Sequence, residues 1–150
     1  MAESPNMKNQ RRTSSTNDLQ MARVLLVDDD VASRLTLQTV LQAGGYRVDA
    51  AASAAEAYGK LDEQEYELVL SDLQMESPEA GLRVIQHARM MDYKPATAIV
   101  TTYQNAKATV GKVKMLIKPE DVPTLLSQVA NLISMRATKR IERELLTAHH

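Results

Sequence analysis

The stretch that decides the fold is VLLVDDD, residues 24–30, in which four apolar residues run directly into three aspartates. A short run that is apolar at every position is typical of a strand buried on both faces of a parallel sheet. Asp28, Asp29 and Asp30 would then follow the carboxyl end of that strand. Ligands bind at this end of the strands in open α/β sheets, so the stretch also indicates where a site would lie.

Further apolar runs and helical patterns alternate along the rest of the chain. The other predicted strands cover residues 46–51, 68–70 ending at Asp72, 98–100 ending at Thr101, and 113–117 ending at Lys118. Helices are predicted from 35 to the glycine pair 44–45, over 53–63, 80–91 and 105–110, and from 121 onward. This alternation predicts a three-layer α/β/α fold with a doubly wound, five-stranded parallel sheet.

The bulk composition is that of one ordinary globular domain. The chain has 150 residues, of which 44% are hydrophobic and 25% are charged. It contains no cysteine, which excludes a disulfide framework and a thiolate zinc site. The net charge of -1 gives no basic excess, so we expect no direct nucleic-acid binding. No secretory signal or membrane span is recognisable, and a cytoplasmic location is expected.

The two ends of the chain differ from its middle. Residues 1–20 are polar and charged, and they are predicted to form a disordered arm before a domain over residues 21–136. Residues 137–150 extend the last predicted helix and carry Ile141, Leu145 and Leu146 in an apolar stripe. Three interpretations stay open for this extension: a dimerisation segment that makes a homodimer, a linker to another domain, or a solvated helix end.

The ends of four predicted strands bring polar groups to one edge of the sheet. The aspartates at 28–30, Asp72, Thr101 and Lys118 occupy these ends. Two carboxylates about 4 Å apart repel by roughly 4 kcal/mol at an effective dielectric near 20, so a cation must share the site. Oxygen ligands without His or Cys suit Mg²⁺. Beside a metal, a lysine and a hydroxyl, Asp72 could attack phosphorus, which implies phosphoryl transfer onto a carboxylate.

Four stretches resemble the signatures of the receiver domain of two-component response regulators, the CheY-like family. They are VLLVDDD at 24–30, LVLSDLQM at 68–75, AIVTT at 98–102 and LIKP at 116–119. The resemblance covers about residues 22–135, and the motifs come in the expected order and at suitable separations. Each motif alone is weak, but the ordered set is specific. It implies a flavodoxin-like fold and a signalling switch that catalyses only its own phosphorylation and dephosphorylation.

The resemblance also implies roles for individual residues. Asp72 would be the phosphoacceptor, taking its group from a sensor histidine kinase, a phosphotransfer protein or a small phosphodonor. Asp29, Asp72 and the backbone carbonyl of Gln74 would bind Mg²⁺ directly, and Asp28 would act mainly through bound water. Lys118 would pair with a phosphoryl oxygen.

Two threonines and a proline complete the roles that the resemblance implies. Thr101 would move to hydrogen-bond the phosphoryl group and so couple chemistry to shape. Thr102 is small enough to leave the phosphoryl group accessible. In the family the peptide bond between the lysine and the proline, here Lys118 and Pro119, is usually cis.

The sequence departs from the family pattern at its switch. Met115 stands where the family commonly has Tyr or Phe, and a flexible thioether cannot reproduce the rotamer change of an aromatic ring. The stretch from Thr101 to Lys118 is several residues shorter than usual. The loop at 75–81 lacks the usual Met-Pro and Asp-Gly pairs, although Ser-Pro at 77–78 suggests a turn and Gly81 lies near the usual glycine. Activation is therefore expected to follow a different route.

Two other functions compete with the receiver interpretation. Residues 28–32, DDDVA, resemble the nucleophile motif of haloacid-dehalogenase-like phosphatases, with Asp28 as nucleophile and Asp30 as acid/base. That reading places Ala32 where Thr or Val is needed, finds no acidic pair after Lys118, and leaves Asp72 without a role. We therefore interpret Asp30 as a helix cap.

The second rival is a pseudo-receiver, an interaction module that keeps the fold without the phosphoryl switch. Met115 lends it some weight, but all the acceptor-site residues are present. A dinucleotide-binding fold is excluded because no glycine-rich turn follows the first strand.

Overall fold

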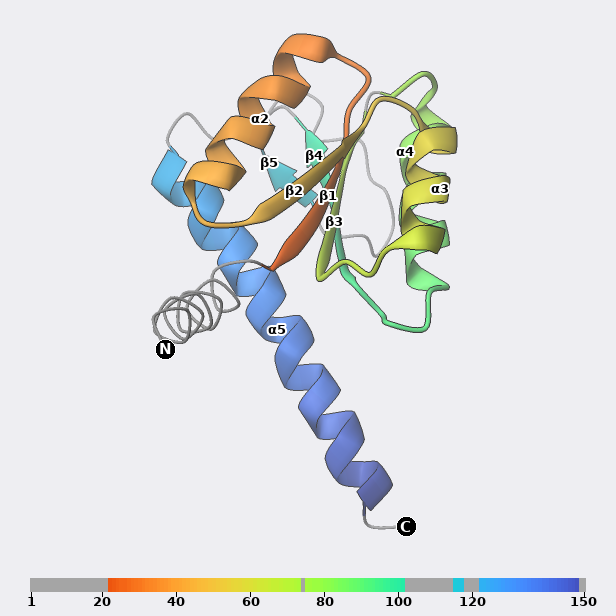
Figure 1. Ribbon diagram of the computed structural model, residues 1–150, viewed down its shortest axis with the longest axis vertical. Coiled ribbons are helices and arrows are strands. Elements are labelled where there is room, and N and C mark those ends of the chain that lie inside the picture. Colours follow the sequence, from red (N-terminus) through yellow and green to blue (C-terminus); the bar gives the residue numbers. More distant parts are fainter. Residues whose placement is uncertain (1–21, 74, 102–114, 118–121, 149–150) are drawn as a thin grey trace, which may run out of the picture.

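The computed structural model describes residues 22–73, 75–101, 115–117 and 122–148. Within these ranges, strands and helices alternate in the predicted order (Figure 1). The elements are β1 (Arg23–Val27), α2 (Val31–Ala43), β2 (Arg47–Ala51), α3 (Ala54–Glu63), β3 (Leu68–Asp72), α4 (Pro78–Arg89), β4 (Ala96–Thr101), β5 (Met115–Ile117) and α5 (Val122–Ala148).

The five strands form one parallel sheet. Their order is β2-β1-β3-β4-β5, and every neighbouring pair is parallel. This is the flavodoxin-like order, in which the chain first moves outward from β1 to β2 and then crosses to β3 on the other side. The predicted fold class is confirmed. The crossover makes the carboxyl ends of β1 and β3 the place where a ligand crevice is expected.

Helices cover both faces of the sheet. The helices α2 and α5 pack on one face, and α3 and α4 pack on the other (Figure 1). The strand β1 shows why: Val24 and Leu26 belong to the apolar cluster under α2 and α5, whereas Leu25 and Val27 belong to the cluster under α3 and α4. All four side chains are at most 1% exposed. The continuous apolar run therefore does mark a strand that is buried on both faces.

Local capping fixes where two of the helices begin. The side chain of Asp30 accepts a hydrogen bond from the backbone of Ser33 at 2.8 Å and caps α2, which confirms its interpretation as a cap. Ser53 caps α3 by accepting from the backbone of Glu56 at 3.1 Å. The carboxylate of Glu56 accepts in turn from the backbone of Ala52 at 2.8 Å. This reciprocal arrangement reaches one residue further back than the usual capping box.

Several predicted boundaries were wrong. The helix α2 begins at Val31 rather than at residue 35, and α4 ends at Arg89 rather than at residue 91. The helix α4 begins at Pro78 rather than at residue 80. Ser77 and Pro78 are its N-cap and first residue, and not the turn that the sequence suggests. The fourth strand begins at Ala96 rather than at residue 98. The predicted arm at 1–20, the predicted helix at 105–110, residues 113–114 and the Lys118–Pro119 bond lie outside the described residues.

The last helix is one continuous element of 27 residues, α5, and is about 40 Å long. Its second half runs well beyond the sheet (Figure 1). Ile141, Leu145 and Leu146 on this half are 57%, 57% and 69% exposed, so the predicted apolar stripe lies at the surface. In the described part of the chain, no helix is long and apolar enough to cross a membrane.

Candidate functional site

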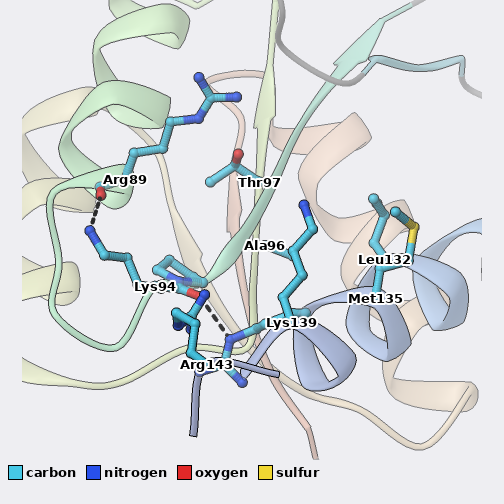
Figure 2. Close-up of a pocket in the computed structure, with 10 residues that line it drawn as sticks. Arg89, Lys94, Ala96, Thr97, Leu132, Met135, Lys139 and Arg143 are labelled. Atoms are coloured by element: carbon cyan, nitrogen blue, oxygen red, sulfur yellow. Dashed lines mark hydrogen bonds between the residues drawn. The ribbon is translucent and has the colours of Figure 1, made fainter. Parts of the chain in front are cut away.

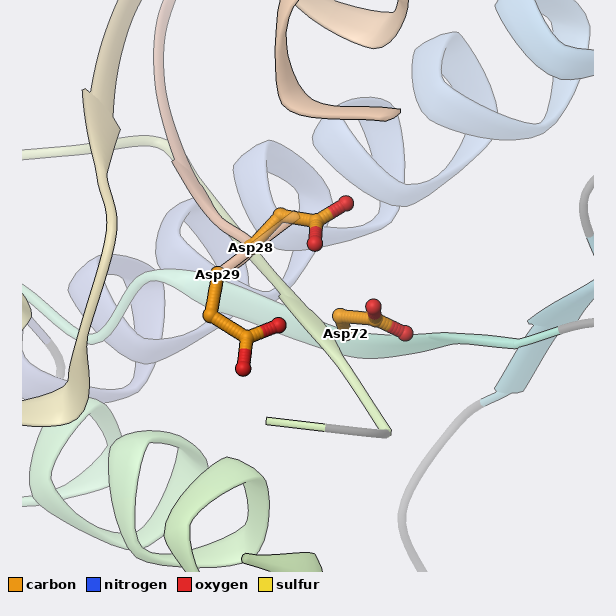
Figure 3. Close-up of side chains that lie close together, drawn as sticks. All are labelled: Asp28, Asp29 and Asp72. Atoms are coloured by element: carbon orange, nitrogen blue, oxygen red, sulfur yellow. The ribbon is translucent and has the colours of Figure 1, made fainter. Parts of the chain in front are cut away.

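Three aspartates gather where β1 and β3 end. The two strands are neighbours, with Val27 paired to Ser71, so the residues that follow them reach the same edge of the sheet. One carboxylate oxygen from each of Asp28, Asp29 and Asp72 lies within 4.8 Å of the other two (Figure 3). The structure thus brings together the three acidic side chains that the sequence placed at this edge.

Asp28 is the buried member of this cluster, which we call the acidic triad. Its side chain is 0% exposed, and its Oδ1 accepts a hydrogen bond from the backbone of Asp30 at 2.9 Å. Its other oxygen, Oδ2, is buried and has no hydrogen-bond partner among the described residues. A buried acceptor without a partner is costly, typically by about 1–3 kcal/mol and more when it is charged. A ligand at this oxygen would remove that cost.

The donor set of the acidic triad fits a hard divalent cation. At a separation of 4.8 Å, two carboxylates repel by about 3 kcal/mol at an effective dielectric of 20. Asp29 is exposed and Asp72 is half-buried, so the cluster opens to solvent on one side. The triad offers only oxygen donors, the ligands that Mg²⁺ prefers. The residues present therefore fit the predicted magnesium site.

Backbone pairing of β3 with β4 fixes the position of Asp72. Asp72 is the last residue of β3 and pairs with Val100 of β4, and the backbone of the next residue, Leu73, donates to the carbonyl of Val100 at 3.0 Å. Thr101 ends β4 and is 1% exposed. The carboxylate and the hydroxyl thus come from the ends of adjacent strands, as predicted.

The remaining predicted site residues are placed only in part. Met115 begins β5 and pairs with Ile99 of β4. Gln74, Thr102 and Lys118 lie outside the described residues. Their predicted roles, and the switch role of Met115, stay predictions.

Arg34 is a neighbour of the site that the sequence reasoning missed. Its guanidinium donates to the backbone carbonyl of Asp28 at 2.8 Å and so brings a positive charge next to the acidic triad. The sequence indicates this contact only in part. Arg34 lies one helical turn after Asp30, which caps the same helix, so Arg34 is expected near the end of β1. Nothing in the spacing shows that its side chain turns back to the strand end.

A doubly wound sheet with three carboxylates at its crossover has the architecture of a receiver domain. Residues 24–130 match the response regulator receiver domain family, and the chain belongs to that family. A relative of known function is the transcriptional regulatory protein ZraR of Escherichia coli K12, which is 28% identical over 130 residues. The match covers 83% of this chain and 29% of ZraR, so this chain spans less than a third of that regulator.

Solved receiver structures resemble the fold closely. The response regulator TrrA of Thermotoga maritima, in complex with Mg²⁺ and BeF, is 28% identical with a TM-score of 0.66, over 75% of this chain and 99% of that one. The chemotaxis response regulator CheY4 of Vibrio cholerae is 32% identical with a TM-score of 0.61, over 75% of this chain and 98% of that one.

Proposed function

We propose that this chain is a phosphorylation switch in which Asp72 accepts a phosphoryl group in a Mg²⁺-dependent reaction. The donor would be the phosphohistidine of a sensor histidine kinase or of a phosphotransfer protein, and the setting would be the cytoplasm. The observation that carries the proposal is the acidic triad, with three carboxylates within 4.8 Å and one buried oxygen of Asp28 that has no partner among the described residues.

The residues that would hold the metal are Asp28, Asp29, Asp72 and the backbone carbonyl of Gln74. When bound, Mg²⁺ supplies positive charge that offsets both the carboxylates and the phosphoryl oxygens. The TrrA relative was crystallised with Mg²⁺ and BeF, which supports the same ligand class here.

The chain's own residues would then divide the work of the transfer. A carboxylate oxygen of Asp72 forms the new P–O bond while the P–N bond to the donor histidine breaks, and the electron pair leaves with the imidazole. Asp72 is half-buried and hence accessible to a donor, whereas Asp28 is fully buried and lies on the interior side of the site. The hydroxyl of Thr101 and the ammonium of Lys118 would donate to the phosphoryl oxygens.

The signal would leave the site through β4 and β5. Thr101 is buried at the end of β4, so a move of its hydroxyl toward the phosphoryl group must be accommodated by the side chains packed around it. Met115 lies on the neighbouring strand, and a flexible thioether in that position would repack without a ring flip. Thr102 would leave the acyl phosphate accessible to water and to partners.

Stabilisation by a phosphoryl analogue tests this function. Beryllofluoride with Mg²⁺ binds only a folded acceptor site, and at a hundred times its Kd a ligand stabilises by about 2.7 kcal/mol. For a chain of this size we expect the melting temperature to rise by roughly 5–10 °C. Asp72→Asn should abolish the rise, and Asp92→Asn, an exposed carboxylate away from the triad, should keep it. If the unaltered chain showed no rise, a pseudo-receiver would be the better description.

A further inference from the structure

A second charged cavity lies at the opposite edge of the sheet from the acidic triad. It has a volume of about 340 Å³ and is bounded by the end of α4, the start of β4 and the middle of α5 (Figure 2). The strand β4 begins at the cavity with Ala96 and ends near the triad with Thr101, roughly 17 Å away. The cavity is therefore separate from the phosphoacceptor site.

Cationic side chains dominate the wall of this cavity, which we call the basic cavity. The lining includes Arg89, Lys94, Arg136, Lys139 and Arg143, and it includes no carboxylate among the described residues. Nor does any of these five form an ion pair with a carboxylate in the described part of the chain. The whole chain has 18 basic and 19 acidic residues, so its overall composition does not explain the gathering.

Arg136 fixes the shape of the cavity. Its Nε donates to the carbonyl of Lys94 at 3.0 Å, and its Nη2 donates to the carbonyl of Tyr93 at 2.8 Å. These bonds tie α5 to the loop before β4 and use much of the guanidinium. Burial lowers the pKa of Arg136, and the nearby carboxylate of Glu67 opposes that effect. Arg136 is therefore a structural tie, and four other cations remain to face a ligand.

These four cations reach the cavity from two sides. Lys139 and Arg143 extend from α5, while Arg89 ends α4 and Lys94 lies in the loop that follows it (Figure 2). The ammonium of Lys94 donates to the carbonyl of Arg89 at 3.3 Å, which holds the two residues together. Like charges that line one cavity, with no carboxylate among the described lining residues, repel one another, and an anion bound in the cavity relieves that repulsion.

Part of the lining of the basic cavity is apolar, and we call this part its floor. Leu132 is 7% exposed, Met135 is 38% exposed, and Pro95 is buried beside them. Small-molecule sites have volumes of about 300–1,000 Å³ and combine apolar walls with a few well-placed polar groups. The cavity falls at the lower end of that range, which suits one nucleotide rather than a dinucleotide. Cations at the rim and an apolar floor together suit a ligand with a charged end and a flat, less polar body.

We propose that the basic cavity binds a small polyphosphorylated ligand of the nucleoside diphosphate class. The phosphates face Lys139 and Arg143 with the cations of the α4 end, and the base rests on the floor formed with Leu132. A nucleic-acid backbone fits less well, because it needs an extended row of cations, whereas these line one cavity from separate elements. The site is independent of the acidic triad.

Calorimetric titration of the full chain with ADP and with GDP, in EDTA so that no metal bridges a nucleotide to the triad, tests the proposal. We expect saturable binding at one site per chain and no measurable binding of adenosine. Lys139→Gln and Arg143→Gln should each weaken binding at least about tenfold, since each removes a charged contact to phosphate. Both side chains are exposed, so neither change should impair folding.

Arg140→Gln is the matched control. Arg140 lies on the same turn of α5 but outside the cavity and pairs with Glu144 at 3.6 Å, so the loss of its charge should leave binding unchanged. The proposal is overturned if neither nucleotide binds at concentrations up to about 1 mM, the upper end of ordinary metabolite affinities. It is equally overturned if the cavity variants bind like the unaltered chain. Tighter, variant-sensitive binding of duplex DNA would overturn it in favour of a nucleic-acid surface.

Discussion

Gly81 of α4 lies directly against the backbone carbonyl of Asp72 at the end of β3. A Cβ atom on residue 81 would stand 2.6 Å from that oxygen, closer than non-bonded carbon and oxygen atoms approach, and 3.5 Å from the side chain of Ser71. The obstacle is backbone, so it cannot rotate away. The absence of a side chain at Gly81 is thus what allows α4 to pack over the residue proposed to accept the phosphoryl group.

Gly81→Ala should therefore destabilise the chain and disturb Asp72 together. Overpacking of this kind costs about 1–3 kcal/mol, and we expect a slower phosphorylation rate at the same Mg²⁺ concentration. Urea unfolding and a phosphorylation time course measure the two effects. Gly59→Ala in α3 is the control, because a Cβ there meets no atom of the described residues within 4 Å, and it should stabilise by up to about 1 kcal/mol. Equal effects of the two changes would contradict the packing argument.

Asp28→Asn should stabilise the metal-free chain. The change removes one of three mutually repelling charges and the buried charged oxygen that has no partner in the described part of the chain. The amide oxygen can still accept from the backbone of Asp30. In EDTA we expect a gain of about 1–3 kcal/mol in the free energy of unfolding. In Mg²⁺ the variant should gain less from the metal than the unaltered chain does.

Urea unfolding with and without Mg²⁺ measures both parts of this prediction. Asp92→Asn removes an exposed carboxylate outside the triad. It should leave the free energy of unfolding in EDTA, and the gain on adding Mg²⁺, nearly unchanged. If Asp28→Asn were no more stable in EDTA and responded fully to Mg²⁺, then the triad would not be a strained, cation-sharing cluster.

The free energy of unfolding should fall steeply at alkaline pH because of Tyr66, which is buried, and Tyr93, which is half-buried. Burial, with the negative charges of Glu65 and Asp62 adding to it, raises the pKa of Tyr93 to about 12. Burial and the hydrogen bond to Asp49 likewise raise the pKa of Tyr66. An unfolded tyrosine loses its proton near pH 10, so the unfolded state binds fewer protons above that pH. The contribution of these tyrosines to the free energy of unfolding is fully present below about pH 10 and is lost as the pH rises through about 12.

Unfolding by urea between pH 8 and 12, with tyrosinate absorbance recorded alongside, checks the alkaline prediction. Tyr93→Phe should flatten the decline, although it also removes the hydrogen bond from Tyr93 to the carbonyl of Leu61. An unfolding free energy that declined with the same slope in this variant would show that other groups govern alkaline unfolding.

The exposed stripe on the second half of α5 has three open interpretations: a segment that makes a homodimer, a linker to another domain, or a solvated helix end. If it dimerises this chain, Ile141→Ser with Leu145→Ser should raise the dimer dissociation constant by at least about tenfold, because two large apolar side chains lose their burial. Sedimentation across a concentration series measures this. Met90→Ser is the control, since Met90 is 79% exposed but lies outside the stripe. A chain that is monomeric throughout would leave the linker and the solvated helix end as the open interpretations.

Local patterns were enough to predict most of the fold. The run at 24–27 is apolar on both faces, which only a strand between two helical layers tolerates, and Ser53 and Asp30 cap helices through hydrogen bonds to residues three positions away. The acidic triad followed from topology, because parallel strands present their carboxyl ends at one edge. Such features depend on neighbours in the sequence or on strand order alone.

Features that depend on tertiary contacts could not be predicted in the same way. The basic cavity joins residues 89–97 to residues 132–143, and only the packing of α5 beside β4 brings these two segments together. The turn of Arg34 back to the carbonyl of Asp28 depends on a side-chain rotamer, which spacing does not determine. The early start of α4 was missed for a different reason: Ser-Pro at 77–78 serves equally well in a turn and at a helix start.

The central claim is that three carboxylates share one cation and leave Asp72 as the group that is phosphorylated. Incubation of the full chain with acetyl phosphate and Mg²⁺, trapping of the acyl phosphate with borohydride, and peptide mapping by mass spectrometry test it most directly. The account predicts modification at Asp72 alone, and none when Mg²⁺ is removed with EDTA. Modification at Asp28, or a folded chain that takes up no phosphoryl group, would contradict it.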